Sequence, residues 1–420
     1  MDEPGSKRRL LLLPAFLYLL MALEIVVMIT PFAVYFYSVY GPVLEFISGN
    51  RYLCWLADFF LPHLVFTKDP LIIGMSYLML LFIIGLLIFI ASALPLYYAR
   101  IFKRDMQVGG LYRIVRHPQY LGLAVSGLGL LIYWPRFIIL FLYVSMLFVY
   151  YILARNEEWR MKRKFGEKYE LYMRKTSMFI PGEPGGKIYR AIFGRGPSTA
   201  PGPEGWPSPV GNLTNPSRLL LLYLILLAGS FSLAFMTRGY IEEKIPLSQG
   251  DGLAVISVLP EETGEAQALL SSILAEGRLQ EVLSPEMNLI YSMPADYFLM
   301  AVVTDEPRRY SDEKAREIGP REWERRRFGE GPVRFLRIFY HYLLALGTGG
   351  PENDSAVQRF IFVSVKDRNG MPVKREKILK PGLLRLPLLL VDIDRRGRKI
   401  IEVKRASGRN KWGRAPMPAF

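Results

Sequence analysis

Four stretches of the sequence consist almost entirely of apolar residues. They are Leu10–Tyr37, Leu71–Ala99, Tyr120–Ala154 and Leu219–Met236. A helix needs about 20 consecutive apolar residues to cross the hydrocarbon core of a bilayer. Because each stretch reaches about that length, the pattern predicts membrane-spanning helices in all four.

The third stretch is too long for a single crossing, and it is interrupted at Tyr133–Arg136. Pro135 lacks the backbone N–H that a helix interior requires, and Arg136 prefers water or lipid headgroups to hydrocarbon. We therefore expect two helices joined by a tight turn. With this helical hairpin the chain has five predicted spans.

Lys and Arg are scarce in one connection and concentrated elsewhere. The connection between the first two spans holds only Arg51 and Lys68. Basic residues on short connections mark the cytoplasmic side of a membrane protein. In a five-span chain all the strongly basic segments fall on one side, so the N-terminus is expected to be cytoplasmic and the region after Met236 extracytoplasmic. The basic segments contain Lys7, Arg8 and Arg9; Arg100, Lys103, Arg104, Arg113 and Arg116; and Arg155, Arg160, Lys162, Arg163, Lys164, Lys168, Arg174 and Lys175.

Beyond Met236 the pattern changes to that of a soluble α+β domain. Residues 253–259 and 297–303 read as strands, and residues 264–279 have helical spacing. Residues 359–378 read as a hairpin with Asn369-Gly370 at its turn, a dipeptide that suits tight hairpins. We predict an α-helical integral membrane bundle of about five transmembrane helices with a C-terminal soluble α+β domain.

A stretch rich in Gly and Pro separates the last predicted span from the others. Neither a helix nor a strand is stable in such a sequence, so it is expected to be a linker. The predicted division is a transmembrane domain over 1–180, the linker over 181–217, an additional transmembrane helix over 218–237 and the soluble domain over 238–420.

Composition narrows the classes of function. The 420 residues are 51% hydrophobic and carry a net charge of +15, which together favour contact with a membrane and anionic headgroups over nucleic acid. Cys54 is the single cysteine and there are three histidines, so no disulfide within the chain and no Cys/His metal cluster is expected.

Two polar clusters lie at the predicted cytoplasmic ends of the hairpin. The first is the sequence GLYRIVRHPQYLG, which begins at Gly110 and leads into the third span. The second runs from Ala154 to Lys175 and follows the fourth span. Helices that form a hairpin have neighbouring ends, so His117 and Tyr120 should lie within roughly 10 Å of Glu157 and Glu158. Ionisable residues that converge at a membrane boundary indicate a functional site.

The two clusters resemble the integral-membrane methyltransferases of the isoprenylcysteine carboxyl methyltransferase and phospholipid methyltransferase family. The matching residues are Arg116-His117-Pro118-Gln119-Tyr120, then Glu157-Glu158, and then Phe165-Gly166 with Tyr169. The resemblance covers roughly Leu71 to Pro181 and does not include the C-terminal region. It implies a methyltransferase that uses S-adenosylmethionine at the cytoplasmic ends of the hairpin.

The resemblance also implies which residues contact the cofactor. Arg and His side chains can bind a carboxylate, and aromatic faces suit a sulfonium cation. The residues expected to bind the cofactor are Arg104, Asp105, Met106, Gln107, Tyr112, His117, Pro118, Gln119, Tyr120 and Glu158.

Glu157 and Arg116 are the expected catalytic residues, because Glu157 falls where the family places a glutamate at the methyl acceptor. The acceptor is expected to be lipid-borne or hydrophobic and to present a carboxylate, an amine or a thiol. Isoprenylcysteine enzymes have an arginine four residues before that glutamate. Here the position holds Leu153, which disfavours a carboxylate acceptor.

Two other functions remain open from the sequence. Sterol-reductase-type membrane enzymes share a similar Arg-His-Pro-x-Tyr segment and use NADPH, but they have about twice as many spans. Alternatively, the spans could anchor a binding or assembly protein that acts through its outer domain, for which the sequence names no partner.

Overall fold

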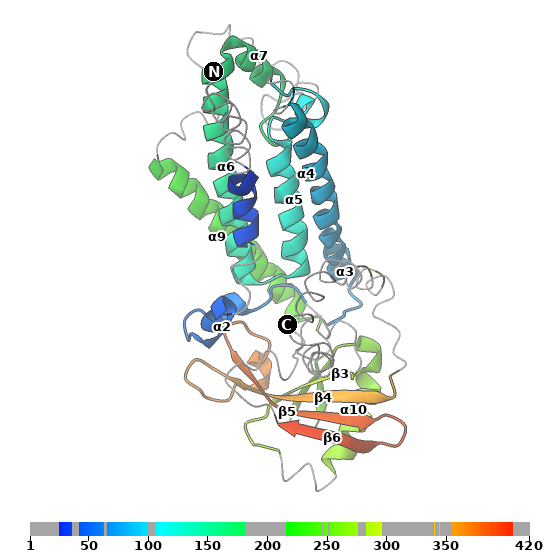
Figure 1. The fold of residues 1–420 in the computed structure, drawn as a ribbon. Helices are drawn as coiled ribbons and strands as arrows, with labels where there is room; N and C mark the ends of the chain where they lie inside the picture. The colour runs from blue at the N-terminus through cyan, green and yellow to red at the C-terminus, as the bar shows by residue number, and fades with distance from the viewer. Residues whose placement is uncertain are drawn as a thin grey trace, which may run out of the picture. The chain divides into compact units, whose positions relative to one another are not determined.

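The computed structural model describes most of the chain in two compact units (Figure 1). The first unit comprises Met1–Tyr40, Met79–Leu131 and Ile139–Phe231, and the second comprises Gly41–Leu78, Ile132–Ile138 and Ser232–Phe420. The described residues are 25–35, 42–62, 65–99, 102, 106–180, 216–245, 247–250, 253–275, 283–295, 340, 344 and 355–405.

Apolar helices account for most of the first unit. Three described helical segments are long and apolar enough to cross a membrane, namely Pro70–Tyr98, Phe137–Phe165 and Leu219–Glu242, and Ile25–Tyr35 and Pro118–Tyr133 are shorter apolar helices. A helical membrane part is thus confirmed, while the count of five spans stays a prediction. The helical elements are α2 (Pro42–Gly49), α3 (Pro70–Tyr77), α4 (Leu81–Tyr98), α5 (Pro118–Tyr133), α6 (Phe137–Phe165), α7 (Glu167–Lys175) and α9 (Pro216–Glu242), with the 3-10 turns η1 (Cys54–Ala57), η2 (Leu78–Leu80) and η4 (Gly110–Arg113).

The break predicted near Pro135 is confirmed, because α5 ends at Tyr133 and α6 begins at Phe137. The expectation that Arg136 prefers water is wrong. Its side chain is 1% exposed, and its guanidinium lies 3.9 Å from the centre of the Phe59 ring and donates to the Ala57 carbonyl. A delocalised guanidinium can be buried where an aromatic face and a carbonyl oxygen replace its water.

Helices α5 and α6 pack side by side and antiparallel (Figure 1). The Tyr143 hydroxyl of α6 donates to the Ala124 carbonyl of α5 at 3.0 Å, and the rings of Tyr120 and Tyr150 stack with centroids 5.1 Å apart. This pairing brings the first turn of α5 beside the polar end of α6.

Helices α4 and α5 approach each other through glycines. A Cβ atom added to Gly85 would lie 2.1 Å from the Ser126 backbone nitrogen, and one added to Gly129 would lie 2.1 Å from that of Phe82. Since only glycine permits such contact between backbones, the two helices are held closer than larger residues would allow.

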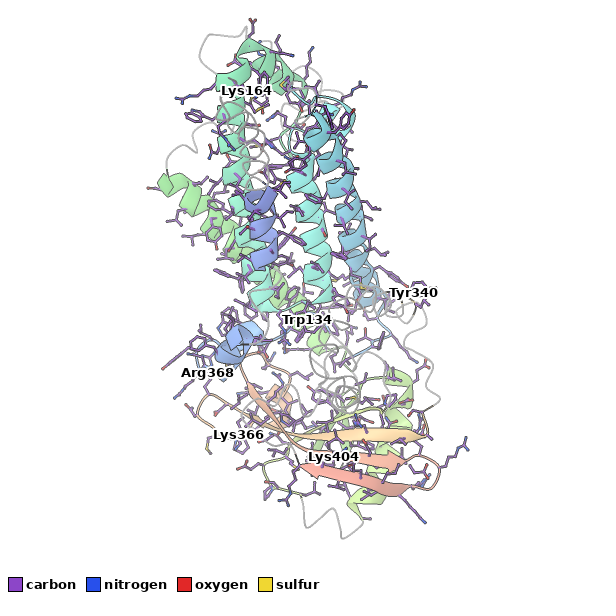
Figure 2. All side chains as sticks on the ribbon, in the orientation of Figure 1. Trp134, Lys164, Tyr340, Lys366, Arg368 and Lys404 are labelled. Atoms are coloured by element: carbon purple, nitrogen blue, oxygen red, sulfur yellow. The ribbon has the colours of Figure 1, made fainter. Side chains whose placement is uncertain are left out.

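A six-stranded sheet forms the described core of the C-terminal region. Its strands lie in chain order, with β2 and β3 parallel through the crossover helix α10 (Thr263–Leu274) and all other neighbours antiparallel. One face of the sheet packs on Leu269, Leu270 and Ile273 of α10. The strands are β1 (Leu247–Gly250), β2 (Leu253–Ser257), β3 (Leu289–Pro294), β4 (Val357–Lys366), β5 (Leu384–Asp394) and β6 (Lys399–Arg405). Figure 2 labels Lys366 at the end of β4 and Lys404 on β6.

The strand predicted at 253–259 and the helix predicted at 264–279 are found as β2 and α10, whereas the strand predicted at 297–303 lies outside the described residues. The predicted hairpin over 359–378 differs in one respect. Its turn is present, with Gly370 at φ 80°, but the chain then forms only one bridge, Lys366 to Pro372, and a 3-10 turn. The strand that follows β4 in the chain and pairs with it is β5, which begins at Leu384.

Segments that connect the spans belong to the same unit as the sheet. The Asp58 carboxylate accepts from the backbone N–H of Gly382 at 2.6 Å and from Arg385 at 3.1 Å. Arg238 of α9 donates to the carbonyls of Phe59 and Leu379. The sequence-based domain boundaries stay predictions, and residues 181–215 of the expected linker lie outside the described residues.

Candidate active site

Four segments of the first unit form the frame of the site. They are η4 and the residues after it, the start of α5, the polar end of α6, and α7. The chain after α7 runs back along the residues before α5, because Arg116 N–H donates to the Ser177 carbonyl at 2.8 Å and His117 N–H to that of Met178 at 3.2 Å. These backbone contacts fix both side chains of the Arg-His pair in position.

Four charged side chains form a continuous row. Arg116 Nε lies 2.6 Å from Glu158 Oε1, and the same oxygen lies 3.5 Å from His117 Nε2. On its other side His117 Nδ1 lies 3.4 Å from Glu157 Oε2. The His117 side chain is 3% exposed and that of Glu157 is 26% exposed, so the row passes from buried to partly open at Glu157.

The two carboxylates determine the protonation of His117. Burial alone would lower its pKa, because a charge is costly away from water. Contacts with Glu157 and Glu158 oppose that effect, and the net result is a pKa raised above the ordinary value of 6.5. The imidazolium is thus stabilised between two carboxylates.

The guanidinium of Arg116 is engaged by the protein itself. Besides Glu158, it donates to the carbonyls of Met173, in the last turn of α7, and Thr176, the residue directly after α7. A buried guanidinium that is paired and hydrogen-bonded in this way holds elements together. Its predicted catalytic role stays a prediction, and its observed contacts are those of a positioning residue.

Hydrogen bonds of tyrosines join the helices around the site. The Tyr112 hydroxyl donates to Gln119 Oε1 at 3.0 Å, and the Tyr172 hydroxyl of α7 donates to the Tyr112 carbonyl at 2.7 Å. Burial raises the pKa of Tyr112 well above its usual value, so this phenol keeps its proton and remains a donor. The η4 turn is therefore attached to both α5 and α7.

A small cavity of about 50 Å³ lies among these side chains. One partly exposed carboxylate, that of Glu157, faces a wall of aromatic, amide and thioether groups that also contains Leu96 and the cationic side chains of Arg116 and His117. Its lining consists of Leu96, Met106, Gln107, Tyr112, Arg116, His117, Gln119, Glu157, Met161, Tyr169 and Tyr172.

Most of the predicted site residues are brought together here. Of these, Met106, Gln107, Tyr112, Arg116, His117, Gln119 and Glu157 line the cavity. Tyr120 stacks on the His117 ring, Glu158 lies behind it, and Pro118 is the first residue of α5. Arg104 and Asp105 lie outside the described residues.

Sequence reasoning missed Leu96, Met161 and Tyr172. Helical spacing could have found two of them, since Met161 lies four residues after Glu157 and Tyr172 three residues after Tyr169. Leu96 comes from α4, and no pattern in the sequence links that helix to the motif.

The chemistry of the lining fits one end of S-adenosylmethionine. Aromatic rings suit the sulfonium cation, and the side-chain amides of Gln107 and Gln119 can hydrogen-bond to its methionyl part. The volume of about 50 Å³ is far below the roughly 300–1,000 Å³ of ordinary small-molecule sites. The described lining therefore fits the cationic end of the cofactor. The remaining part of S-adenosylmethionine would need space outside this cavity.

Many of the exposed side chains around this end of the hairpin are basic. Lys162, Arg163 and Lys164 are exposed on the last turn of α6, where Figure 2 labels Lys164, and the Arg163 guanidinium lies 3.7 Å from the centre of the Trp159 ring. Cationic and aromatic residues at the end of an apolar helix suit the headgroup region of a bilayer.

Together these features define a polar cavity at the adjoining ends of two paired, apolar helices. Residues 71–168 match the model of the phospholipid methyltransferase family, and this part of the chain is a domain of that family of membrane methyltransferases. The match ends just before Tyr169, so most of α7 and the returning segment lie beyond it. No curated protein and no solved structure matches the chain.

Proposed function

We propose that the protein transfers a methyl group from S-adenosylmethionine to the amine of a lipid-borne acceptor. The family match supports a membrane methyltransferase in general. The observation that favours an amine is Glu157, a partly exposed carboxylate in a cavity whose nearest guanidinium, Arg116, already pairs with Glu158. An ammonium group finds a counter-ion there, whereas a carboxylate would face Glu157 and repulsion.

Glu157 is the residue that acts on the acceptor. Its carboxylate binds the ammonium form and takes one proton from it, which leaves a lone pair on the acceptor nitrogen. His117 holds Glu157 in place, and Glu158 contacts the other side of the His117 ring. The pairing of His117 with both carboxylates keeps their mutual repulsion low.

When bound, S-adenosylmethionine supplies a methyl group on a sulfonium, and the thioether that leaves is neutral. The residues proposed to hold it are Met106, Gln107, Tyr112, Gln119 and Tyr169, whose rings and amides surround the cavity. No acid is needed for a neutral leaving group, so the contribution of the protein is to align the two reactants and to exclude water.

The proposal also assigns a side of the membrane. Basic residues flank the site on both helices of the hairpin, which favours the cytoplasmic face, where a soluble cofactor is available. An acceptor carried by a lipid reaches the same face from within the bilayer.

The test uses full-length protein in nanodiscs with S-adenosylmethionine labelled on the methyl group. Three acceptors are compared: a phospholipid with a primary amine headgroup, the same lipid N-acetylated, and a free fatty acid. We expect label only in the amine lipid, because N-acetylation removes the nucleophile. Label in the fatty acid would show a carboxylate acceptor instead. Absence of label from all three would contradict the proposal.

A further inference from the structure

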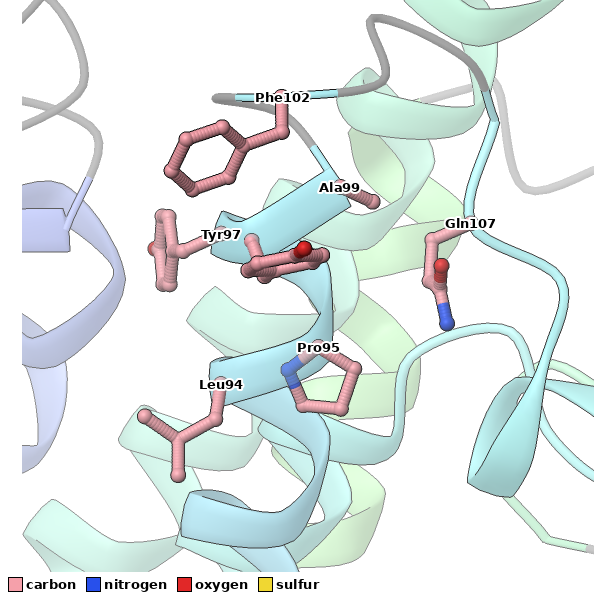
Figure 3. A pocket seen from close by; sticks show the side chains of 7 residues that line it. Leu94, Pro95, Tyr97, Ala99, Phe102 and Gln107 are labelled. Carbon is pink, nitrogen blue, oxygen red and sulfur yellow. The ribbon is translucent and has the colours of Figure 1, made fainter.

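A second and larger cavity borders α4 beside the site. It has a volume of about 600 Å³ and is lined on one side by Leu94, Pro95, Tyr97, Tyr98, Ala99 and Phe102 (Figure 3). Gln107 lines it from the segment that faces the end of α4. The cavity is open to the surface, so it is a groove along the end of α4 rather than an enclosed small-molecule site.

The two cavities are neighbours on the same short stretch of α4. Gln107 lines both of them, and Leu96 lines the small polar cavity while Pro95 and Tyr97, on either side of it, line the large one. The end of α4 is therefore a wall between the two spaces, and Gln107 stands where they meet.

The lining of the large cavity suits a hydrocarbon chain. Apart from the Gln107 amide and two phenol groups its side chains are apolar, so a ligand rich in polar groups would find few partners. Leu94 is 67% exposed, Tyr98 58% and Phe102 68%, on a helix that is apolar enough to cross a membrane. Such exposure is costly in water and suits contact with lipid.

We propose that this cavity binds the hydrocarbon chain of the lipid acceptor, with Gln107 marking the point where the amine headgroup passes into the polar cavity. This inference rests on the proposed function and adds the chain-binding site to it. Leu94, Tyr98 and Phe102 then determine how well the chain of an acceptor fits, and they do so without touching the reacting atoms.

The test compares two matched substitutions on α4. Leu94→Trp fills the cavity, and Leu87→Trp is the control, because Leu87 is 61% exposed on the same helix but does not line the cavity. Each variant, in identical nanodiscs, methylates a short-chain and a long-chain primary amine. Partition into the bilayer favours the long chain equally in all variants, so the ratio of the two rates is compared between variants.

We expect Leu94→Trp to lower the ratio of long-chain to short-chain kcat/KM about tenfold. Each methylene kept from its apolar contact costs about fourfold in binding, so the loss of two methylenes suffices. Leu87→Trp should leave the ratio unchanged. Equal ratios in the wild type and both variants, with both amines methylated, would overturn the chain-binding site and leave the proposed function intact.

A second readout does not depend on turnover. A long-chain amine with a photoreactive diazirine near the chain end should label residues 94–102 in the wild type and label them much less in Leu94→Trp. Labelling elsewhere on the chain would contradict the assignment. If the wild type methylates neither amine, the proposed function itself fails and the chain-binding site with it.

Discussion

Each of the two units contains a buried arginine–carboxylate pair. Arg116 and Glu158 are 10% and 7% exposed, and Arg359 and Asp392 are 9% and 10% exposed. The second pair is bidentate at 2.7 and 2.8 Å, and its members face each other across β4 and β5. In the Arg116–Glu158 pair, Glu158 also contacts His117, and Arg116 lines a cavity.

This difference shows that a buried charge alone does not identify a site. The pair in the sheet satisfies both carboxylate oxygens with one guanidinium, as expected where the role is to hold two strands together. The pair in the helical unit continues through His117 to Glu157, which is partly open to the cavity. A functional site is indicated by that partly exposed end rather than by the ion pair.

The largest expected effect concerns the sides of the membrane. In a Cys54→Ser background, single cysteines at Gly202 and Gly408 should react oppositely with an impermeant thiol reagent in intact cells. Only Gly408→Cys should be labelled, because the basic connections assign residue 202 to the cytoplasm. Permeabilised cells provide the control for reactivity. Equal labelling of both positions in intact cells would rule out the five-span arrangement.

The next effect concerns Glu157, the partly open end of the row. Glu157→Gln keeps the size of the side chain but removes its charge, so methyl transfer should fall by about 10²–10⁴-fold. Binding of S-adenosylmethionine, measured by calorimetry, should change little. Glu170→Gln is the matched control, because Glu170 is exposed on α7. Full turnover of Glu157→Gln, or loss of cofactor binding, would contradict the assigned role.

The two ion pairs themselves allow a direct comparison. Glu158→Gln and Asp392→Asn each leave a buried guanidinium without its counter-ion, which costs about 3–5 kcal/mol. Thermal unfolding in detergent should show both losses. Only Glu158→Gln should also weaken cofactor binding, since it releases His117 as well as Arg116. If Asp392→Asn weakens binding equally, the sheet region supports the site.

Substitution of a glycine by alanine should change stability in opposite directions in the two units. Gly85→Ala places a methyl group against the backbone of α5, so the helices must separate at a cost of about 1–3 kcal/mol. Gly264 in the first turn of α10 has open space around it, and Gly264→Ala should stabilise by about 0.4–1 kcal/mol. Unfolding midpoints of the two variants measure this difference. A neutral Gly85→Ala would show that α4 and α5 are less closely packed.

The hairpin was predictable because local sequence decides it. Pro135 ends one helix, and once two helices are paired, the positions of His117, Glu157 and Glu158 follow from chain length alone. The positioning role of Arg116 was not predictable, because two of its three acceptors, besides Glu158, are the backbone carbonyls of Met173 and Thr176. Any residue type supplies a carbonyl, so no pattern of side chains could reveal them.

The C-terminal region was less predictable for a related reason. The turn at Asn369-Gly370 forms as expected, yet β4 pairs with β5 beyond Leu384 rather than with the residues directly after the turn. The residues of β5, Leu384–Asp394, are mostly apolar, and burial of that longer strand outweighs the local preference for a short hairpin. Arg136 was misjudged similarly, because the ring of Phe59 that covers it is distant in sequence.

The smallest expected effect is a dependence on pH that has opposite signs in the two units. His117 has a pKa raised above 6.5, so its contribution to stability is complete below about pH 6.5 and is lost as the pH rises through the raised value.

The hydrogen bond from Arg395 lowers the pKa of Glu265 below 4.5. The contribution of Glu265 to stability is therefore present above pH 4.5 and is lost as the pH falls through the lowered pKa. The Glu265 side chain is 48% exposed, and such a pair is worth less than about 1 kcal/mol. Amide exchange should therefore increase at the start of α5 as the pH rises through the raised pKa of His117, and in α10 as the pH falls through the lowered pKa of Glu265. His117→Gln and Glu265→Gln should each abolish one dependence and keep the other. If His117→Gln leaves the alkaline change intact, another group titrates at the site.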